Sequence, residues 1–229
     1  MRDHRRREGC ARSPVISAAR FLVVLDADST LIENEVIELL ADAAGSLAQV
    51  AEVTDRAMRG ELDFAESLRE RVATLAGLST DVFAEVGARI RPTDGVHELI
   101  EGVHAAGGRV GVVSGGFHEL LDPLAETLGL DHWRANRLET SAGRLTGGLV
   151  GPIIDASAKA AALTEWAELN GIELCSTVAI GDGANDLTMM RVAGLGVAFN
   201  AKPIVRRSAD LVIDRQDLSQ VLPLLGLRG

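Results

Sequence analysis

Three short apolar segments, each followed by a polar motif, constrain the fold more than any other feature of the sequence. The pairs are Phe21–Leu25 before Asp26, Arg109–Val113 before Ser114-Gly115-Gly116, and Thr177–Ile180 before Gly181–Asp186. Continuous apolar runs of this length are typical of parallel strands buried on both faces. Because ligands bind at the carboxyl ends of strands in open α/β sheets, we expect the three polar motifs to form one composite site.

The segments between these strands have helical patterns. Apolar residues at 96, 99, 100 and 103 repeat with helical spacing before Gly107-Gly108 ends the pattern. Weaker strand patterns follow at 195–199 and 211–213. Alternation of strands and helices predicts an α/β fold with a Rossmann-like parallel sheet and right-handed crossovers.

Residues 33–92 interrupt the alternation with helical patterns alone. The expected helices are 35–44, 47–59, 64–75 and 81–91. A helical insertion directly after the first strand predicts a small cap domain over the ligand-binding edge, with residues 20–32 and 93–229 as the core. A smaller excursion is expected near 136–150, where Ser141-Ala-Gly-Arg144 is typical of a hairpin turn.

Charge and hydropathy limit the functions to consider. The net charge is −10, and residues 1–20 alone carry +4, so the remainder is strongly acidic. An acidic body argues against nucleic acid as a partner, because a phosphate backbone requires a basic face. No apolar run approaches the roughly 18 residues of a membrane span, and no secretory signal is seen, so we expect a cytoplasmic protein without a membrane partner. Residues 1–19 are expected to be a disordered basic tail.

Asp26 and Asp28 are separated by one small residue at the end of the first strand. Two carboxylates this close disfavour joint ionisation unless a divalent cation binds them, and oxygen ligands suit Mg²⁺. One carboxylate can attack a phosphoryl group while the other acts as general acid and then base. A turn with two capping aspartates is the alternative.

Two further motifs are weak when taken alone. Ser114-Gly115-Gly116 offers a hydroxyl and accessible N–H groups to a phosphate, although a plain turn has the same composition. Lys159, near the start of a helical pattern at 157–169, can neutralise a phosphoryl oxygen, although a lysine in that place is usually solvated.

Gly181-Asp-Gly-Ala-Asn-Asp186 is the stronger metal motif. Asp182, Asn185 and Asp186 supply oxygen donors within one strand-to-helix turn. An N-capping turn needs only one such residue, so the excess predicts a Mg²⁺ site.

In this order, the motifs resemble the haloacid dehalogenase superfamily of phosphohydrolases over residues 20–229. Within that superfamily, the chain resembles the phosphoserine phosphatase family. Matching segments are Met58–Phe64, Ser67–Val72, Val112–Phe117, Ala135–Arg137, Gly181–Asp186 and Ala201–Pro203. Ala27 is smaller than the residue often found between the two aspartates, and we expect little consequence.

The resemblance implies a role for each matching residue. Asp26 would be the nucleophile and Asp28 the general acid and base. Mg²⁺ would bind Asp26, the backbone carbonyl of Asp28 and Asp182, with Asp186 in support. The implied substrate contacts are Ser114, Gly115, Lys159 and Asn185 at the phosphoryl group, Glu35 at an ammonium, Arg71 at a carboxylate, and Met58 and Phe64 as pocket walls.

The implied cap contacts agree with elementary chemistry but have alternatives. A substrate with α-ammonium and α-carboxylate groups needs an acid and a base, and arginine binds carboxylate through paired hydrogen bonds. Glu35 would equally suit the first turn of a helix, where the macrodipole favours it. Arg71 would equally be the solvated partner of an acid one turn away, and Met58 and Phe64 would equally be core of the cap.

The resemblance implies Mg²⁺-dependent hydrolysis of O-phosphoserine through an aspartyl-phosphate, the last step of serine biosynthesis. The first alternative is a phosphatase or phosphotransferase acting on another small phosphomonoester. The second is a non-catalytic binding protein on the same scaffold. The expected partner is a small-molecule substrate, and the expected assembly is a monomer or homodimer.

Overall fold

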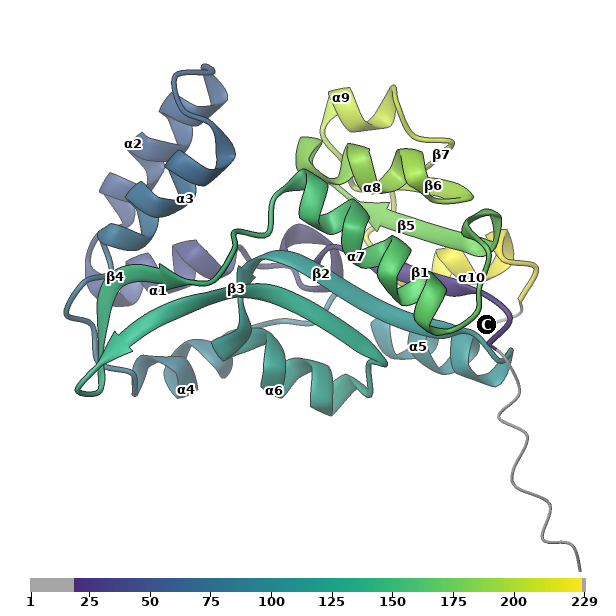
Figure 1. The fold of residues 1–229 in the computed structure, drawn as a ribbon, viewed down its shortest axis with the longest axis horizontal. Helices are drawn as coiled ribbons and strands as arrows, with labels where there is room; N and C mark the ends of the chain where they lie inside the picture. The colour runs from purple at the N-terminus through teal and green to yellow at the C-terminus, as the bar shows by residue number, and fades with distance from the viewer. Residues whose placement is uncertain (1–18, 228–229) are drawn as a thin grey trace, which may run out of the picture.

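A seven-stranded sheet with helices on both faces organises the computed structural model, which describes residues 19–227 (Figure 1). The spatial order is β4-β3-β2-β1-β5-β6-β7, and every neighbouring pair is parallel except β3 and β4. The strands are β1 Leu22–Leu25, β2 Arg109–Phe117, β3 His132–Ser141, β4 Arg144–Val150, β5 Thr177–Gly181, β6 Leu195–Phe199 and β7 Leu211–Ile213. The predicted α/β class with a Rossmann-like parallel core is confirmed.

Ten α-helices lie between or after these strands within the described residues. They are α1 Val36–Ala44, α2 Leu47–Met58, α3 Phe64–Ala73, α4 Val82–Gly87, α5 Val96–Ala105, α6 His118–Leu128, α7 Ala156–Leu169, α8 Leu187–Val192, α9 Pro203–Arg206 and α10 Val221–Leu224. None of them is long and apolar enough to span a membrane. The expected basic tail lies outside the described residues, apart from Ala19.

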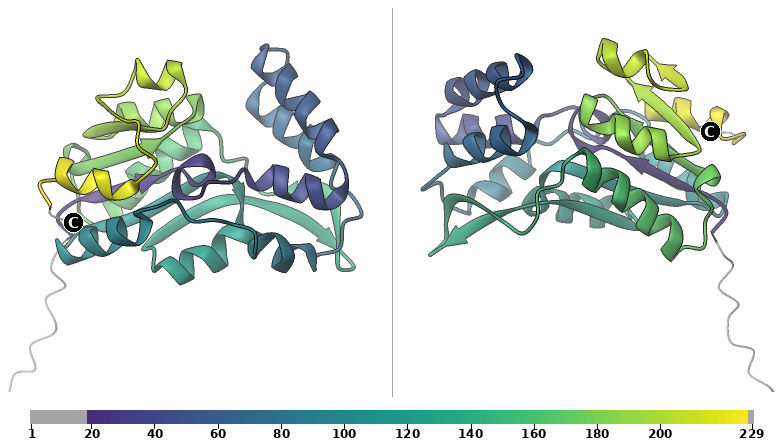
Figure 2. Two further views of the ribbon diagram at one scale, coloured as in Figure 1. Left: turned by 180° about the vertical axis from the view of Figure 1, so that it is seen from behind. Right: turned by 45° about the horizontal axis from the view of Figure 1, so that its top comes forward.

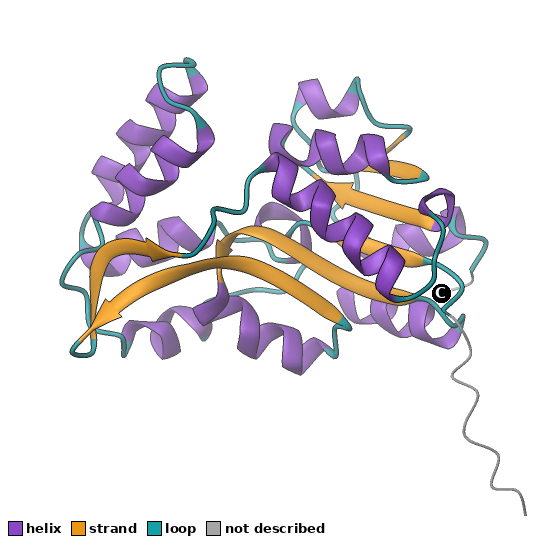
Figure 3. Ribbon diagram, viewed as in Figure 1, coloured by secondary structure: helices purple, strands orange, loops and turns teal. Residues whose placement is uncertain are grey.

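Every residue of β1 is buried, and its alternating side chains enter two different cores. Val23 and Leu25 belong to the core that includes α5, α6 and α10. Leu22 and Val24 belong to the core formed with α7, α8 and α9. Figure 3 shows the helices on either side of the strands. A strand covered on both faces has no polar face, which explains the unbroken apolar run in the sequence.

The helices expected between 33 and 92 are present, with small differences at their ends. Gly45 ends α1 in the left-handed conformation, with a φ of 69°. The last helix, α4, stops at Gly87 instead of Arg91, because Arg89 and Ile90 donate to carbonyls only three residues back. Figure 2 shows α2 and α3 side by side, projecting from one end of the sheet. The division of the chain into a core and a separate cap domain stays a prediction.

The hairpin expected near 136–150 is present, and its first strand belongs to the main sheet. β3 begins at His132, runs parallel to β2, and is followed by the antiparallel β4. Ala142 and Gly143 both have positive φ, 50° and 73°, as a two-residue type I′ hairpin turn requires.

β2 continues to Phe117, although the apolar pattern predicted an end at Val113. Its pairing with β3 is regular up to Val113 and resumes where Phe117 lies opposite Asn136. Between these points β2 contains Ser114, Gly115 and Gly116, whereas β3 contains only Ala135. The surplus residues make β2 bulge, so the Ser-Gly-Gly motif lies within the strand instead of in a turn after it.

Gly111 allows α7 to pack closely on β2. A Cβ at this position would lie 2.8 Å from two ring carbons of Trp166. We expect Gly111→Ala to lower the free energy of unfolding by about 1–3 kcal/mol, because α7 would have to shift. Urea unfolding followed by circular dichroism measures the change.

Gly87→Ala is the matched control for this substitution. A Cβ on Gly87 would have its nearest neighbour 4.0 Å away, at Leu120. Its unfolding free energy should change by less than about 1 kcal/mol. Equal midpoints for Gly111→Ala and wild type would contradict the tight packing of Trp166.

Candidate active site

The carboxyl ends of β2, β1 and β5 bring the three polar motifs together. β1 pairs with β2 on one side and with β5 on the other, and the N–H of Asp26 donates to the carbonyl of Ile180 at 2.9 Å. A cavity of about 850 Å³ opens over this edge. Its lining includes Asp26, Asp28, Gly115, Asp182 and Asn185 from the sheet side and Glu35, Met58, Phe64 and Arg71 from the helical insertion.

Lys159 lies below the cavity surface and is fully buried between two carboxylates. Its Nζ is 2.6 Å from Oδ1 of Asp26 and 2.8 Å from Oδ1 of Asp186. Burial acts to lower the pKa of Lys159, but Asp186 and Asp26 outweigh it and raise the pKa above its usual value. The lysine is therefore a permanent positive charge directly beside Asp26.

Asp26, Asp182 and Asp186 form a buried cluster whose carboxylate oxygens lie within 4.8 Å of one another. Burial raises the pKa of Asp26 to about 7, with Asp186 adding to the effect. Burial also raises the pKa of Asp182 to about 6. Carboxylates this close disfavour one another's ionised form unless a cation lies between them. Their oxygens are the donors that Mg²⁺ prefers.

Asp186 has less capacity for a metal than the other two carboxylates. One of its oxygens accepts from Lys159 and the other accepts from the N–H of Gly183 at 3.0 Å. Asp26 engages Lys159 and the N–H of Ala27 through the same oxygen, Oδ1. This arrangement fits Asp26 and Asp182 as direct ligands and Asp186 as their support.

Asp28 enters the cavity from the turn Ala27–Leu31, which directly follows β1. Its Oδ1 is buried and has no hydrogen-bond partner among the described residues. Burial, followed by the charges of Glu35 and Asp26, raises the pKa of Asp28 well above its usual value. A carboxyl group that holds its proton can serve as a general acid.

The bulge in β2 supplies the second wall of the site. Oγ of Ser114 accepts from the N–H of Gly116 at 2.8 Å, so the serine hydroxyl is engaged within its own loop, and only 2% of the residue is exposed. A Cβ on Gly116 would lie 3.4 Å from Oδ2 of Asp28. Glycine therefore permits the backbone to approach the acid closely.

Glu35 and Arg71 face the cavity from the helical insertion. Oε1 of Glu35 accepts from the hydroxyl of Ser29 at 2.8 Å. Nε of Arg71 donates to the carbonyl of Ser67 at 3.3 Å, and no carboxylate among residues 19–227 lies within 4.0 Å of its guanidinium. Burial lowers the pKa of Arg71, although Glu35 acts in the opposite direction. Arg71 is thus a half-buried cation with free hydrogen-bond donors.

Met58 and Phe64 line the same cavity in different ways. Met58 is 79% exposed at the end of α2. Phe64 begins α3 and reaches the β2 bulge, where a Cβ on Gly115 would lie 3.0 Å from its ring. Phe64 therefore joins the insertion to the sheet, whereas Met58 stands at the rim.

Sequence reasoning missed two residues of the site. Ser29 adopts a left-handed conformation with φ of 57°, which no local pattern indicated. Lys202 lines the cavity, donates its N–H to the carbonyl of Asp182 at 3.0 Å and places Nζ 3.8 Å from its carboxylate. The match of Ala201–Pro203 to the family pattern could have pointed to Lys202, but no role was assigned to that segment.

Comparisons with known sequences agree with this geometry. A family model described as haloacid dehalogenase-like hydrolase matches residues 23–191. The chain is 50% identical to a phosphoserine phosphatase of Streptococcus thermophilus, over 92% of this chain and 98% of that one. It is 54% identical to a phosphoserine phosphatase of Streptomyces coelicolor over 91% of its own length, but it spans only 51% of that longer relative.

Solved structures give the same result. A structure described as a phospho-aspartyl intermediate analogue of phosphoserine phosphatase has a TM-score of 0.85 and 42% identity, covering 90% of this chain and 99% of the other. A substrate-bound phosphoserine phosphatase complex also has a TM-score of 0.85 and 42% identity, with 90% and 98% coverage. The chain therefore belongs to the haloacid dehalogenase-like hydrolases and, within them, to the phosphoserine phosphatase family.

Proposed function

We propose that this protein hydrolyses O-phosphoserine to serine and phosphate, with Mg²⁺ and through an aspartyl-phosphate on Asp26. The observation that carries the proposal is the division of the cavity into two chemically different walls. Asp26, Asp28 and the lysine beneath them suit phosphoryl transfer. Glu35 and Arg71, on the wall that the helical insertion forms, suit the ammonium and carboxylate of an amino acid.

In the first step, a carboxylate oxygen of Asp26 bonds to phosphorus as the bond from phosphorus to the serine oxygen breaks. Asp28 gives its proton to the departing serine oxygen, in keeping with its raised pKa. The ammonium of Lys159 offsets charge on the phosphoryl oxygens. Bound Mg²⁺ would supply further charge neutralisation at the phosphoryl group, held by Asp26, Asp182 and the carbonyl of Asp28.

In the second step, water attacks phosphorus and the bond to Asp26 breaks. Asp28, now a carboxylate, takes a proton from that water, which restores both residues and releases phosphate. Ser114, Gly115 and Asn185 hold the phosphoryl group, and Asp186 keeps Lys159 in place through its 2.8 Å contact.

The insertion provides selection in this proposal. Glu35 binds the substrate ammonium, Arg71 binds its carboxylate, and Met58 and Phe64 enclose its carbon atoms. All of these residues belong to one chain, so a monomer suffices, and a homodimer would leave the chemistry unchanged. A cytoplasmic location suits the proposal, because a small charged substrate does not cross a bilayer unaided.

Asp26→Asn replaces the nucleophile with an amide of nearly the same shape. Phosphate release from phosphoserine with Mg²⁺ should fall at least about a thousandfold. The fold should survive, because the substitution removes one charge from a crowded acidic cluster. Asp42→Asn, which affects an exposed partner of Arg89, is the control and should retain activity. Full turnover by Asp26→Asn would exclude the mechanism.

Arg71→Ala tests the substrate class. The value of kcat/KM for phosphoserine should fall about 10- to 100-fold, because a charge-assisted carboxylate contact is lost. The value for phosphoethanolamine, which lacks the carboxylate, should change less than about threefold. Arg56→Ala is the control, since Arg56 pairs with Glu70 at 2.6 Å and does not line the cavity. Equal losses on both substrates would show that Arg71 supports the helices instead.

Mg²⁺ alone should stabilise the EDTA-treated protein. At about 100 times the Kd, linkage adds about 2.7 kcal/mol, which corresponds to roughly 5–10 °C in Tm for a chain of this size. Asp182→Asn should lose most of this shift, whereas Asp210→Asn, which affects a carboxylate bonded to Gly196, should keep it. Scanning fluorimetry provides the measurement, and an unchanged wild-type Tm would refute the metal site.

A further inference from the structure

Asn136 is a buried polar residue on β3 that the reaction described above does not use. Only 2% of it is exposed, and it does not line the cavity. Its Nδ2 donates to the carbonyl of Gly115 at 2.8 Å, and its Oδ1 accepts from the N–H of Ile154 at 2.9 Å. One amide therefore connects two segments that are distant in the sequence.

The first connection holds the β2 bulge in shape. The peptide between Gly115 and Gly116 is bonded at both ends, with its carbonyl on Asn136 and its N–H on Oγ of Ser114. Glycine torsions rotate freely, so without these bonds the peptide could take several orientations. Holding this peptide also fixes the backbone of Gly115, which lines the cavity.

The second connection reaches the helix that carries Lys159. Ile154 directly precedes Asp155, whose carboxylate caps α7 by accepting from the N–H groups of Ser157 and Ala158. The N–H of Lys159 donates to the carbonyl of Asp155 at 2.9 Å. A shift of Ile154 would therefore move the first turn of α7 and with it the lysine.

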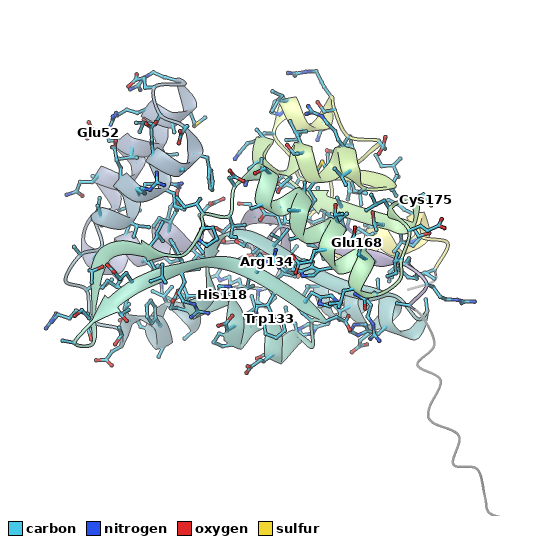
Figure 4. The ribbon with its side chains drawn as sticks, in the orientation of Figure 1. Glu52, His118, Trp133, Arg134, Glu168 and Cys175 are labelled. Carbon is cyan, nitrogen blue, oxygen red and sulfur yellow. The ribbon has the colours of Figure 1, made fainter. Side chains whose placement is uncertain are left out.

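β3 is well placed to act as a rigid support, because side chains anchor it to helices on both faces. Arg134 pairs with Glu165 of α7 at 2.9 Å, and Nε1 of Trp133 donates to Asp122 of α6 at 2.8 Å. Figure 4 shows Trp133 and Arg134 on this part of the sheet.

We propose that Asn136 is a positioning residue that sets the Ser114–Gly116 loop and the start of α7 in register around the phosphoryl group. The proposal rests on the proposed function for the roles of the loop and of Lys159. Asn136 acts through these segments and touches no substrate atom. Substitution of Asn136 should consequently weaken the handling of the phosphoryl group by the same factor, whatever the rest of the substrate is.

Two substitutions test the two hydrogen bonds. Asn136→Leu keeps the branched shape and the number of heavy atoms and removes both bonds. Asn136→Asp keeps an acceptor for Ile154 but places an oxygen against the carbonyl of Gly115. Both should lower kcat about 10- to 100-fold and raise the inhibition constant of inorganic phosphate, because small displacements of positioned groups are costly to the rate. The factor should be the same for phosphoserine and p-nitrophenyl phosphate.

Thr177→Val is the matched control. Thr177 is also buried, and its hydroxyl joins the carbonyl of Leu174 at 2.8 Å to the N–H of Gly194 at 3.3 Å, at the opposite end of the sheet. This variant should lose Tm as Asn136→Leu does but keep kcat and phosphate inhibition within about twofold. If Asn136→Leu also lost only Tm, its role would be structural and the proposal would be wrong. A wild-type enzyme active only on p-nitrophenyl phosphate would instead refute the proposed function and leave this comparison intact.

A measurement on the wild-type protein tests the proposal even if the variants do not fold. Inorganic phosphate with Mg²⁺ should slow hydrogen exchange of the Asn136 side-chain amide at least about tenfold, because phosphate binds only the bonded loop. The Asn170 amide, which donates to the carbonyl of Trp166 at 2.7 Å, should be unaffected. Unchanged exchange at Asn136 under saturating phosphate would overturn the proposal.

Discussion

The buried ammonium of Lys159 is the interaction on which the rest of the site depends. It lies 2.6 Å from Asp26 and 2.8 Å from Asp186, and it has no exposed surface. A buried ammonium with no partner would cost about 3–5 kcal/mol, and the two carboxylates remove that cost. The three residues of this ion-pair cluster come from different elements. Asp26 follows β1, Lys159 belongs to α7, and Asp186 lies in the turn after β5. The ion pair therefore restricts how these elements can be arranged at the sheet edge.

One lysine does not balance the carboxylates around it. Asp26, Asp28 and Asp182 all have raised pKa values, and burial is the largest cause in each case. The surplus of negative charge makes the site receptive to a divalent cation. Asp28 is suited to hold a proton, because burial raises its pKa and its Oδ1 has no hydrogen-bond partner among the described residues. Burial and crowding of these carboxylates thus favour both a bound cation and a protonated Asp28.

The sequence predicted those parts of the fold that depend on local pattern. The bounds of β6 and β7 agree with the predicted apolar runs. The polar motifs at the strand ends were expected to form one site, and Asp26 and Asp182 do lie together because β1 pairs with β5. The β2 bulge could not be predicted, because it exists only relative to the register of β3. The bonds of Asn136 depend on that same register. The left-handed Ser29 was missed because serine rarely adopts this conformation.

The contact between Phe64 and Gly115 brings the helical insertion onto the sheet edge. The groups that would handle the phosphoryl lie on the sheet edge, whereas Glu35 and Arg71 lie on the insertion. A Cβ on Gly115 would come within 3.0 Å of the Phe64 ring, so any larger residue there would push the two walls apart. Gly115 therefore lets the insertion pack directly onto the part of the β2 backbone that lines the cavity. In the proposed function, changes elsewhere on the insertion would alter the preferred substrate while the sheet edge stays the same.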